Sequence, residues 1–287
     1  NYRAISVKPD GNRIESVIIK HIENGKEVEL KAPLFSDCTG DGTIGYLAGA
    51  DYNMGRESRA EYGEELAPIQ PDKMTMGSSV QWYSADKGKP TRFPIFSYGL
   101  QFNEKNCEKV TMGEWKWETG MNFNQIDDFE RIRDYGLMVI YSNWSFLKNE
   151  LKDNKKYKNR ALDWVAYIAG KRESRRLLGD YILKQDDIDK NVYHEDASFV
   201  TTWSIDLHFP DSLNASHFPD APFKAATKHI HIISLCSALS LPIFQKYRES
   251  FYGGPQYQCY PCGTGHCPRN AYHRNDGRSC RDGSFLM

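Results

Sequence analysis

The sequence predicts an α/β fold, with a strand–turn–helix part over residues 1–50 and a β-rich part with helices over residues 51–228. Three stretches support this prediction. In residues 2–31 apolar and polar side chains alternate, as in a meander of strands. Residues 34–50 contain a glycine turn, and residues 126–148 carry apolar side chains at helical spacing. Strands, glycine turns and helices that follow one another along a chain are typical of mixed folds.

Residues 2–31 are expected to form three antiparallel strands. The first strand ends at the sequence Pro-Asp-Gly-Asn over residues 9–12, which is a strong turn signal. Residues 14–22 alternate and are rich in β-branched side chains, and Asn24-Gly25 favours a two-residue hairpin turn after them.

Residues 34–50 read as a short buried strand, a tight turn and a helix of small residues. Gly40, Gly42 and Gly45 match G-x-G-x-x-G, in which glycines let the backbone approach a phosphate and a helix N-terminus supplies N–H groups. A turn that needs glycine but binds nothing is the alternative. A dinucleotide-binding glycine motif normally follows the first strand of its domain. Here the strand-like residues 2–31 precede the glycine motif, so we do not expect it to be the first phosphate loop.

The clearest predicted helix covers residues 126–148, where apolar side chains recur on one face. A shorter helix is expected over residues 160–169, with Gly170 as its stop signal. Residues 66–124 are rich in proline, glycine and aromatic side chains and predict a β-rich domain. Its tryptophans either line a ligand groove or belong to the core, and these are Trp82, Trp115 and Trp117.

A cluster of charges follows Gly170, and it includes Arg172, Arg175 and Arg176. Arginine forks hold carboxylates and phosphates in a fixed geometry, so these side chains are candidates for binding an anionic ligand. An internal network of salt bridges is the alternative.

Residues 200–208 are expected to form one strand that ends in Asp206 and His208. Side chains two apart on a strand face the same side, so the carboxylate can orient the imidazole for proton transfer. A purely structural histidine is the alternative.

The bulk properties exclude several classes of protein. A length of 287 residues suits one large or two moderate domains, and the formal net charge of −1 gives no general attraction to nucleic acid or anionic membranes. No apolar run is long enough to span a bilayer. The last part of the chain is rich in cysteine, and zinc or iron–sulfur ligation in a metal-binding interaction module is one reading of Cys259, Cys262, Cys267 and Cys280.

Several ordered motifs resemble a family of bacterial FAD-dependent oxidoreductases. The first motifs are D-C-T-G-D-G over residues 37–42, A-G-A over residues 48–50 and M-G-R-E-S over residues 54–58. G-K-R-E-S-R-R over residues 170–176 and W-S-I-D-L-H over residues 203–208 follow in the same order as in the family.

The resemblance implies a remnant of an FAD domain of the two-dinucleotide-binding type, with an inserted β-rich cap domain. In this truncated form the fold class would be α+β. It implies FAD as cofactor and hydride transfer between a small organic substrate and the flavin. The cofactor-binding residues that it suggests are Thr39, Gly40, Asp41 and Gly42. It supports a substrate-binding or cofactor-binding role for Arg172, Arg175 and Arg176, and it leaves His208 with Asp206 as the candidate proton carrier.

The tail is expected to be out of frame. When the last two bases of each codon are read with the first base of the next, the tail can spell the closing segment of the same family. Residues 238–248 allow P-Y-R-C-L-Y-S-R-N-I, and residues 251–270 allow a part that starts with F-M-A-G-R-N-I-S. We infer a frame shift between about Ile230 and Ala238, so residues 229–287 are expected to be disordered and to provide no metal ligands. With the first dinucleotide loop also missing, the chain is expected to be a fragment that binds FAD weakly or not at all.

Overall fold

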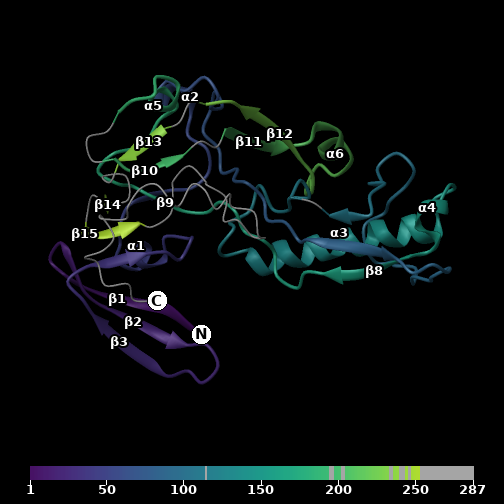
Figure 1. Cartoon of the computed structure of the whole chain (residues 1–287), viewed down its shortest axis with the longest axis horizontal. Helices are drawn as coiled ribbons and strands as arrows, with labels where there is room; N and C mark the ends of the chain where they lie inside the picture. The colour runs from purple at the N-terminus through teal and green to yellow at the C-terminus, as the bar shows by residue number, and fades with distance from the viewer. Residues whose placement is uncertain are drawn as a thin grey trace. The chain divides into compact units, whose positions relative to one another are not determined.

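The structure is a computed structural model, and it describes residues 1–113, 115–193, 197–201, 204–232, 235–238, 243–244 and 247–252 (Figure 1). The chain forms two compact units. The first unit comprises residues 1–71, 175–204 and 231–287, and the second comprises residues 72–174 and 205–230. The tail cysteines and most of the tail predicted to be out of frame lie outside the described residues.

The first unit begins with an antiparallel sheet in the order β1-β2-β3, which confirms the predicted meander. Its strands are β1 (Tyr2–Asp10), β2 (Arg13–His21) and β3 (Glu27–Lys31). Gly11 and Gly25 have φ values of 60° and 72° in the turns, a conformation that glycine adopts without steric cost.

The glycine turn of the first unit joins β4 (Phe35–Asp37) to α1 (Thr43–Leu47), as the sequence predicts. Strand β4 pairs in parallel with β15 (Tyr247–Tyr252), which pairs with β14 (Ile243–Phe244). The unit also contains two short strand pairs and two short helices. These are β5 (Tyr52–Asn53) with β9 (Arg176–Leu177), β10 (Ala197–Thr201) with β13 (Leu235–Ala238), α2 (Arg59–Tyr62) and α5 (Gln185–Asp189).

The second unit packs a long helix against a small antiparallel sheet. The predicted helix is confirmed as α3 (Phe129–Asn149), and the sheet has the order β7-β6-β8. Its strands are β7 (Met112–Gly113), β6 (Trp82–Asp86) and β8 (Arg160–Val165). A second pair joins β11 (Ile205–Pro210) to β12 (Ala225–Ile230), and the short helices are α4 (Lys155–Lys158) and α6 (Ser212–His217).

Each unit has its own hydrophobic core. In the second unit, Trp144 and Leu147 of α3 are fully buried and pack with Trp82 and Trp117. In the first unit, Val17 of β2 packs in a smaller core with residues around α1. In the first half of α3 the buried residues recur at helical spacing, as the amphipathic stripe of the sequence predicts, whereas residues 142–148 are all buried.

Two sequence predictions about local structure are wrong. The helix expected over residues 160–169 is strand β8, which pairs with β6 from Arg160 opposite Asp86 to Val165 opposite Trp82. Pairing with a distant strand outweighs the local helical pattern here. The single strand expected over residues 200–208 is divided between β10 and β11, which pair with different partners.

The mixture of helices and parallel and antiparallel strands is consistent with the predicted α/β class. The division into a remnant over residues 1–50, an inserted cap over residues 51–228 and a tail over residues 229–287 stays a prediction. Within the described ranges, no helix is both long and apolar enough to cross a bilayer.

Candidate functional site

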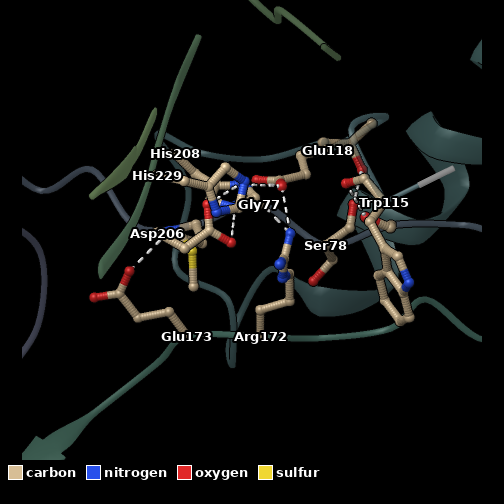
Figure 2. A network of polar contacts seen from close by, with 12 residues as sticks. Gly77, Ser78, Trp115, Glu118, Arg172, Glu173, Asp206, His208 and His229 are labelled. Atoms are coloured by element: carbon tan, nitrogen blue, oxygen red, sulfur yellow. Dashed lines mark hydrogen bonds and ion pairs between the residues drawn. The ribbon is translucent and has the colours of Figure 1, made fainter. Parts of the chain in front are cut away.

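A buried cluster of charged side chains lies in the second unit (Figure 2). It contains Asp206 and His208 of β11, Glu118 of the segment that follows β7, and Arg172 of the segment that follows β8. The side chains are exposed by 0% for Glu118, 4% for Arg172 and His208, and 9% for Asp206. Charged groups removed from water to this extent must compensate one another.

The imidazole of His208 is held between two carboxylates. Its Nδ1 lies 2.5 Å from Oε1 of Glu118, and its Nε2 lies 3.0 Å from Oδ2 of Asp206. Nη1 of Arg172 donates to the same Glu118 oxygen at 2.6 Å, so two cationic groups converge on one carboxylate. The N–H of Gly77 donates to the other oxygen of Glu118 at 3.2 Å. Figure 2 shows these contacts as one continuous network.

Strand geometry explains the first part of this network. Asp206 and His208 are two residues apart on β11 and present their side chains on the same side, as the sequence predicts. Asp206 is also directly opposite His229 of β12 in the register. Nε2 of His229 lies 3.3 Å from Oδ1 of Asp206, and the His229 side chain is 56% exposed. The polar network therefore runs from the surface to the buried Glu118.

The surroundings of His208 favour its charged form. Burial and the charge of Arg172, whose Nη1 lies 3.3 Å from Nδ1, lower the pKa of His208. The hydrogen bond and charge of Glu118 and the hydrogen bond to Asp206 outweigh them, so the net shift of the pKa is upward. In the imidazolium form both ring nitrogens are donors, which matches the carboxylate on each side.

The glycine turn lies in the first unit, and a carboxylate of the chain itself fills the N-terminus of α1. Oδ2 of Asp37 accepts from the N–H groups of Ile44 at 2.7 Å and Gly45 at 3.1 Å. Oδ1 of Asp37 accepts from the N–H and hydroxyl groups of Thr39, and Oγ1 of Thr39 accepts from the N–H of Thr43 at 2.9 Å. The first N–H groups of the helix are thus already paired within the loop.

The three candidate arginines have different surroundings. Arg172 belongs to the buried cluster of the second unit. Arg176, in the first unit, donates to Oε1 of Glu57 at 2.7 Å. Arg175, also in the first unit, places its guanidinium 3.9 Å from the ring centroid of Tyr46. Among the residues that the structure describes, Nη1 of Arg175 is buried without a hydrogen-bond partner.

A family model described as FAD dependent oxidoreductase matches residues 1–230 of the chain. The chain belongs to the FAD-dependent oxidoreductase family. The family binds FAD. None of the curated proteins and none of the solved structures in the comparison matches the chain.

The residues of this chain fit FAD at one position and not at another. The N-terminus of α1 does not fit a phosphate, because Asp37 and Thr39 already pair its N–H groups and a phosphate near Asp37 would be repelled. Nη1 of Arg175 is a buried donor without an acceptor in the described part of the chain, so it fits an anionic group. At the exposed Gly40, with φ of 79°, no atom lies within 4 Å of where a Cβ would be, so a flat ligand can approach the backbone.

Two members of the buried network were not predicted from the sequence. Glu118 lies between Trp117 and Thr119 in the sequence, and nothing local shows that its partners are Arg172 and His208, far along the chain. His229 lies opposite Asp206 only because β11 and β12 form a hairpin, and a histidine within a strand pattern is the only signal for it.

The tryptophans have different surroundings, and the cysteines considered as metal ligands lie outside the described residues. Trp82 and Trp117 are buried in the core, whereas Trp115 is 38% exposed. Within the described part of the chain, no group of three or more potential ligands is arranged to hold a metal ion.

Proposed function

We propose that this chain is an FAD-dependent oxidoreductase that acts on a small organic substrate, with His208 and Asp206 supplying and holding a proton. FAD, when bound, exchanges a hydride with the substrate. The observation that carries the proposal is the imidazole of His208 held between the carboxylates of Glu118 and Asp206, within a chain of this family.

The proton moves between His208 and the surface through Asp206 and His229. His208 is only 4% exposed, so we do not expect it to touch the substrate, and its role is to hold the proton. When a substrate gains a hydride, Asp206 takes the proton from Nε2 of His208, its carboxyl group turns, and Nε2 of His229 receives the proton. The exposed His229 then passes a proton from its other nitrogen to the substrate. The same steps run backwards when the substrate is oxidised.

Glu118 and Arg172 position the imidazole in this proposal. Glu118 accepts from Nδ1 of His208 and leaves Nε2 directed at Asp206, and Arg172 balances the charge of Glu118. We propose that Arg176, whose guanidinium is paired with Glu57, positions the chain around Glu57 in the first unit.

We propose that Arg175 holds an anionic part of FAD or of the substrate. Arg172 and Arg176 are paired with Glu118 and Glu57, whereas Nη1 of Arg175 is buried without a hydrogen-bond partner among the described residues. Thr39, Gly40, Asp41 and Gly42 lie in the same unit, and we propose that their turn approaches an uncharged part of FAD.

Titration of the purified full chain with FAD, followed by flavin fluorescence, tests this proposal. The sequence predicts weak binding or none, so we expect binding that is weak but measurable at high FAD concentration. We expect Arg175→Gln to weaken it about tenfold or more, because a hydrogen bond to a charged group contributes about 1.5–3 kcal/mol. Arg131→Gln is the matched control, since Arg131 also lies over an aromatic ring, that of Phe123. The proposal fails for this chain if the wild type does not bind FAD, and the role of Arg175 fails if its variant binds as the wild type does.

The proton path is tested by the pH dependence of flavin reduction. The FAD-loaded chain is mixed anaerobically with a panel of small alcohols, hydroxy acids and amines, and the loss of the visible flavin absorbance is followed. With a substrate that reacts, we expect His208→Gln and His229→Gln to slow flavin reduction. We also expect both variants to lose the same pH-dependent change in the rate that the wild type shows. An unchanged pH profile in both variants would contradict the path.

We also propose that the chain beyond about residue 230 is translated out of frame. The support is the codon-overlap reading of the tail, together with the family match over residues 1–230. Sequencing the coding DNA over codons 228–240 is the test. An unbroken family-like reading of the tail in the present frame would overturn the proposal.

A further inference from the structure

An aromatic pocket of about 230 Å³ opens on the second unit, beside the start of β6 and the end of β8. Its walls include Trp115, Trp164, Tyr167 and Ile168, and its polar part includes Gln81. The N–H of Ala166 donates to the backbone oxygen of Gln81 at 2.8 Å, which ties the two edges of the pocket together.

The aromatic rings of this pocket are unusually exposed. The exposed fraction is 38% for Trp115, 45% for Trp164 and 83% for Tyr167. Tyr83, the cross-strand neighbour of Trp164, stacks on it at 5.9 Å and is itself 43% exposed. The adjacent residue Trp82 is 2% exposed and fills the core from the other face of the sheet, so the exposed rings are not needed to build that core. Exposed apolar surface concentrated in one place indicates a binding site.

Contacts with Arg172 and Ser79 hold Trp115 in place. The guanidinium of Arg172 lies 5.6 Å from its ring centroid, and Ser79 donates its hydroxyl to the Trp115 backbone oxygen at 3.0 Å. Because Arg172 is itself fixed by Glu118, one wall of the pocket is preorganised.

The size and charge of the pocket limit its ligand. Pockets for drug-sized ligands measure about 300–1,000 Å³, so this one suits a single ring. Among the residues that the structure describes, no charged side chain lines it, which favours a neutral ligand. Within the described residues, the side-chain amide of Gln81 makes no hydrogen bond, and it offers both a donor and an acceptor.

We propose that this pocket binds a neutral sugar ring of the pyranose type. The C–H face of a pyranose packs on the faces of Trp and Tyr rings, while its hydroxyl groups bond to an amide and to water. A shallow pocket with half-exposed rings suits a ligand that keeps part of its surface in water. A purely aromatic ligand favours deeper burial and leaves the Gln81 amide without a partner. Binding of a sugar at this pocket is separate from the proposed redox function and requires no flavin.

The test is a titration of the full chain, without added FAD, with methyl glucopyranoside, cellobiose and maltose. Binding is followed by tryptophan fluorescence and by saturation-transfer NMR, which reports which sugar protons contact the protein. We expect saturation of the C–H protons of one face. We expect Trp164→Ala to weaken binding about tenfold, Trp164→Phe to retain most of it, and Gln81→Ala to weaken it several-fold.

Tyr98→Ala is the matched control, because Tyr98 is an 81% exposed aromatic residue of the same unit that does not line the pocket. We expect it to leave sugar binding unchanged. The proposal is overturned if none of the three sugars binds, or if indole or benzyl alcohol binds more tightly at the same residues. It is also overturned if Trp164→Ala and Gln81→Ala alter only the sedimentation mass, because the face then joins two copies of the chain.

Discussion

His208 makes the stability of the second unit depend on pH. The pKa of His208 is raised in the folded chain, so its stabilising contribution is fully present below the ordinary histidine pKa of about 6.5 and is lost as the pH rises through the folded value. We therefore expect the difference in melting temperature between the wild type and His208→Gln to be largest near pH 6 and to shrink toward pH 8.5.

Thermal unfolding followed by circular dichroism at several pH values measures this difference. His217→Gln is the control, because His217 is an exposed histidine of the same unit at the end of α6. A difference for His208→Gln that stays constant over this range would show that the imidazole does not gain a proton on folding.

Glu118 connects the two cationic groups of the buried cluster. Replacing it with glutamine removes the charge that balances Arg172 and His208, and these side chains are only 4% exposed. Breaking a buried pair costs about 3–5 kcal/mol, so we expect Glu118→Gln to lower the free energy of unfolding by that amount in a urea titration. Glu130→Gln, which breaks the exposed pair with Arg133 on α3, should cost less than about 1 kcal/mol. Equal effects of the two variants would show that the cluster is open to water.

At the residue scale, the sequence predicts pairs that are close along the chain. Asp206 and His208 share one side of a strand, and the period of two is sufficient to predict their contact. The contacts of Glu118 with Arg172 and His208 span 54 and 90 residues, and no local pattern encodes them. The sequence likewise left a salt bridge and a ligand as alternatives for the arginines, because the partner of each depends on the tertiary fold.

At the scale of single elements, α1 shows how a short helix is held without a ligand. Asp37 ends β4 and accepts from two N–H groups at the start of α1, which has only five residues. Asp37→Asn keeps the size of the side chain but removes its charge and one acceptor. We expect it to destabilise the turn by about 1–3 kcal/mol and to speed amide exchange at Ile44 and Gly45.

Hydrogen exchange followed by mass spectrometry, on peptides that cover residues 38–50, measures this effect. Asp51→Asn is the control, because Asp51 is an exposed acid just after the same helix. If Asp37→Asn leaves exchange unchanged, Asp37 does not fill the helix N-terminus in solution, and those N–H groups would remain available to a phosphate.

The elements that the sequence predicts correctly are those with strong local periodicity. The meander of β1, β2 and β3 and the helix α3 each follow from a repeat of side chains within one stretch. Strand β8 was predicted as a helix because its local pattern is short and ambiguous. Its structure depends on β6, and on Lys148, whose ammonium group donates to the backbone oxygen of Arg160 at 2.9 Å.

At the scale of the whole molecule, the sequence predicts the α/β class, and its division of the chain into domains stays a prediction. The first unit takes residues 175–204 as well as residues 1–71, partly through the pairing of β9 with β5. That pair has two residues in each strand, which is too short to produce a recognisable sequence pattern. A division at residues 50 and 228 follows composition and motif order, whereas the units follow contacts between distant segments.

Because the cores of the two units share no residue, a cavity in one core should weaken that unit first. Leu147 is 0% exposed in the second unit and Ile14 is 6% exposed in the first, and replacing a buried residue of this size with alanine costs about 2–5 kcal/mol. We expect Leu147→Ala to raise amide exchange mainly within residues 72–174, and Ile14→Ala to raise it mainly within residues 1–71. The two variants are matched in size and burial, so exchange that rises equally throughout both units in each variant would show that they unfold as one cooperative body.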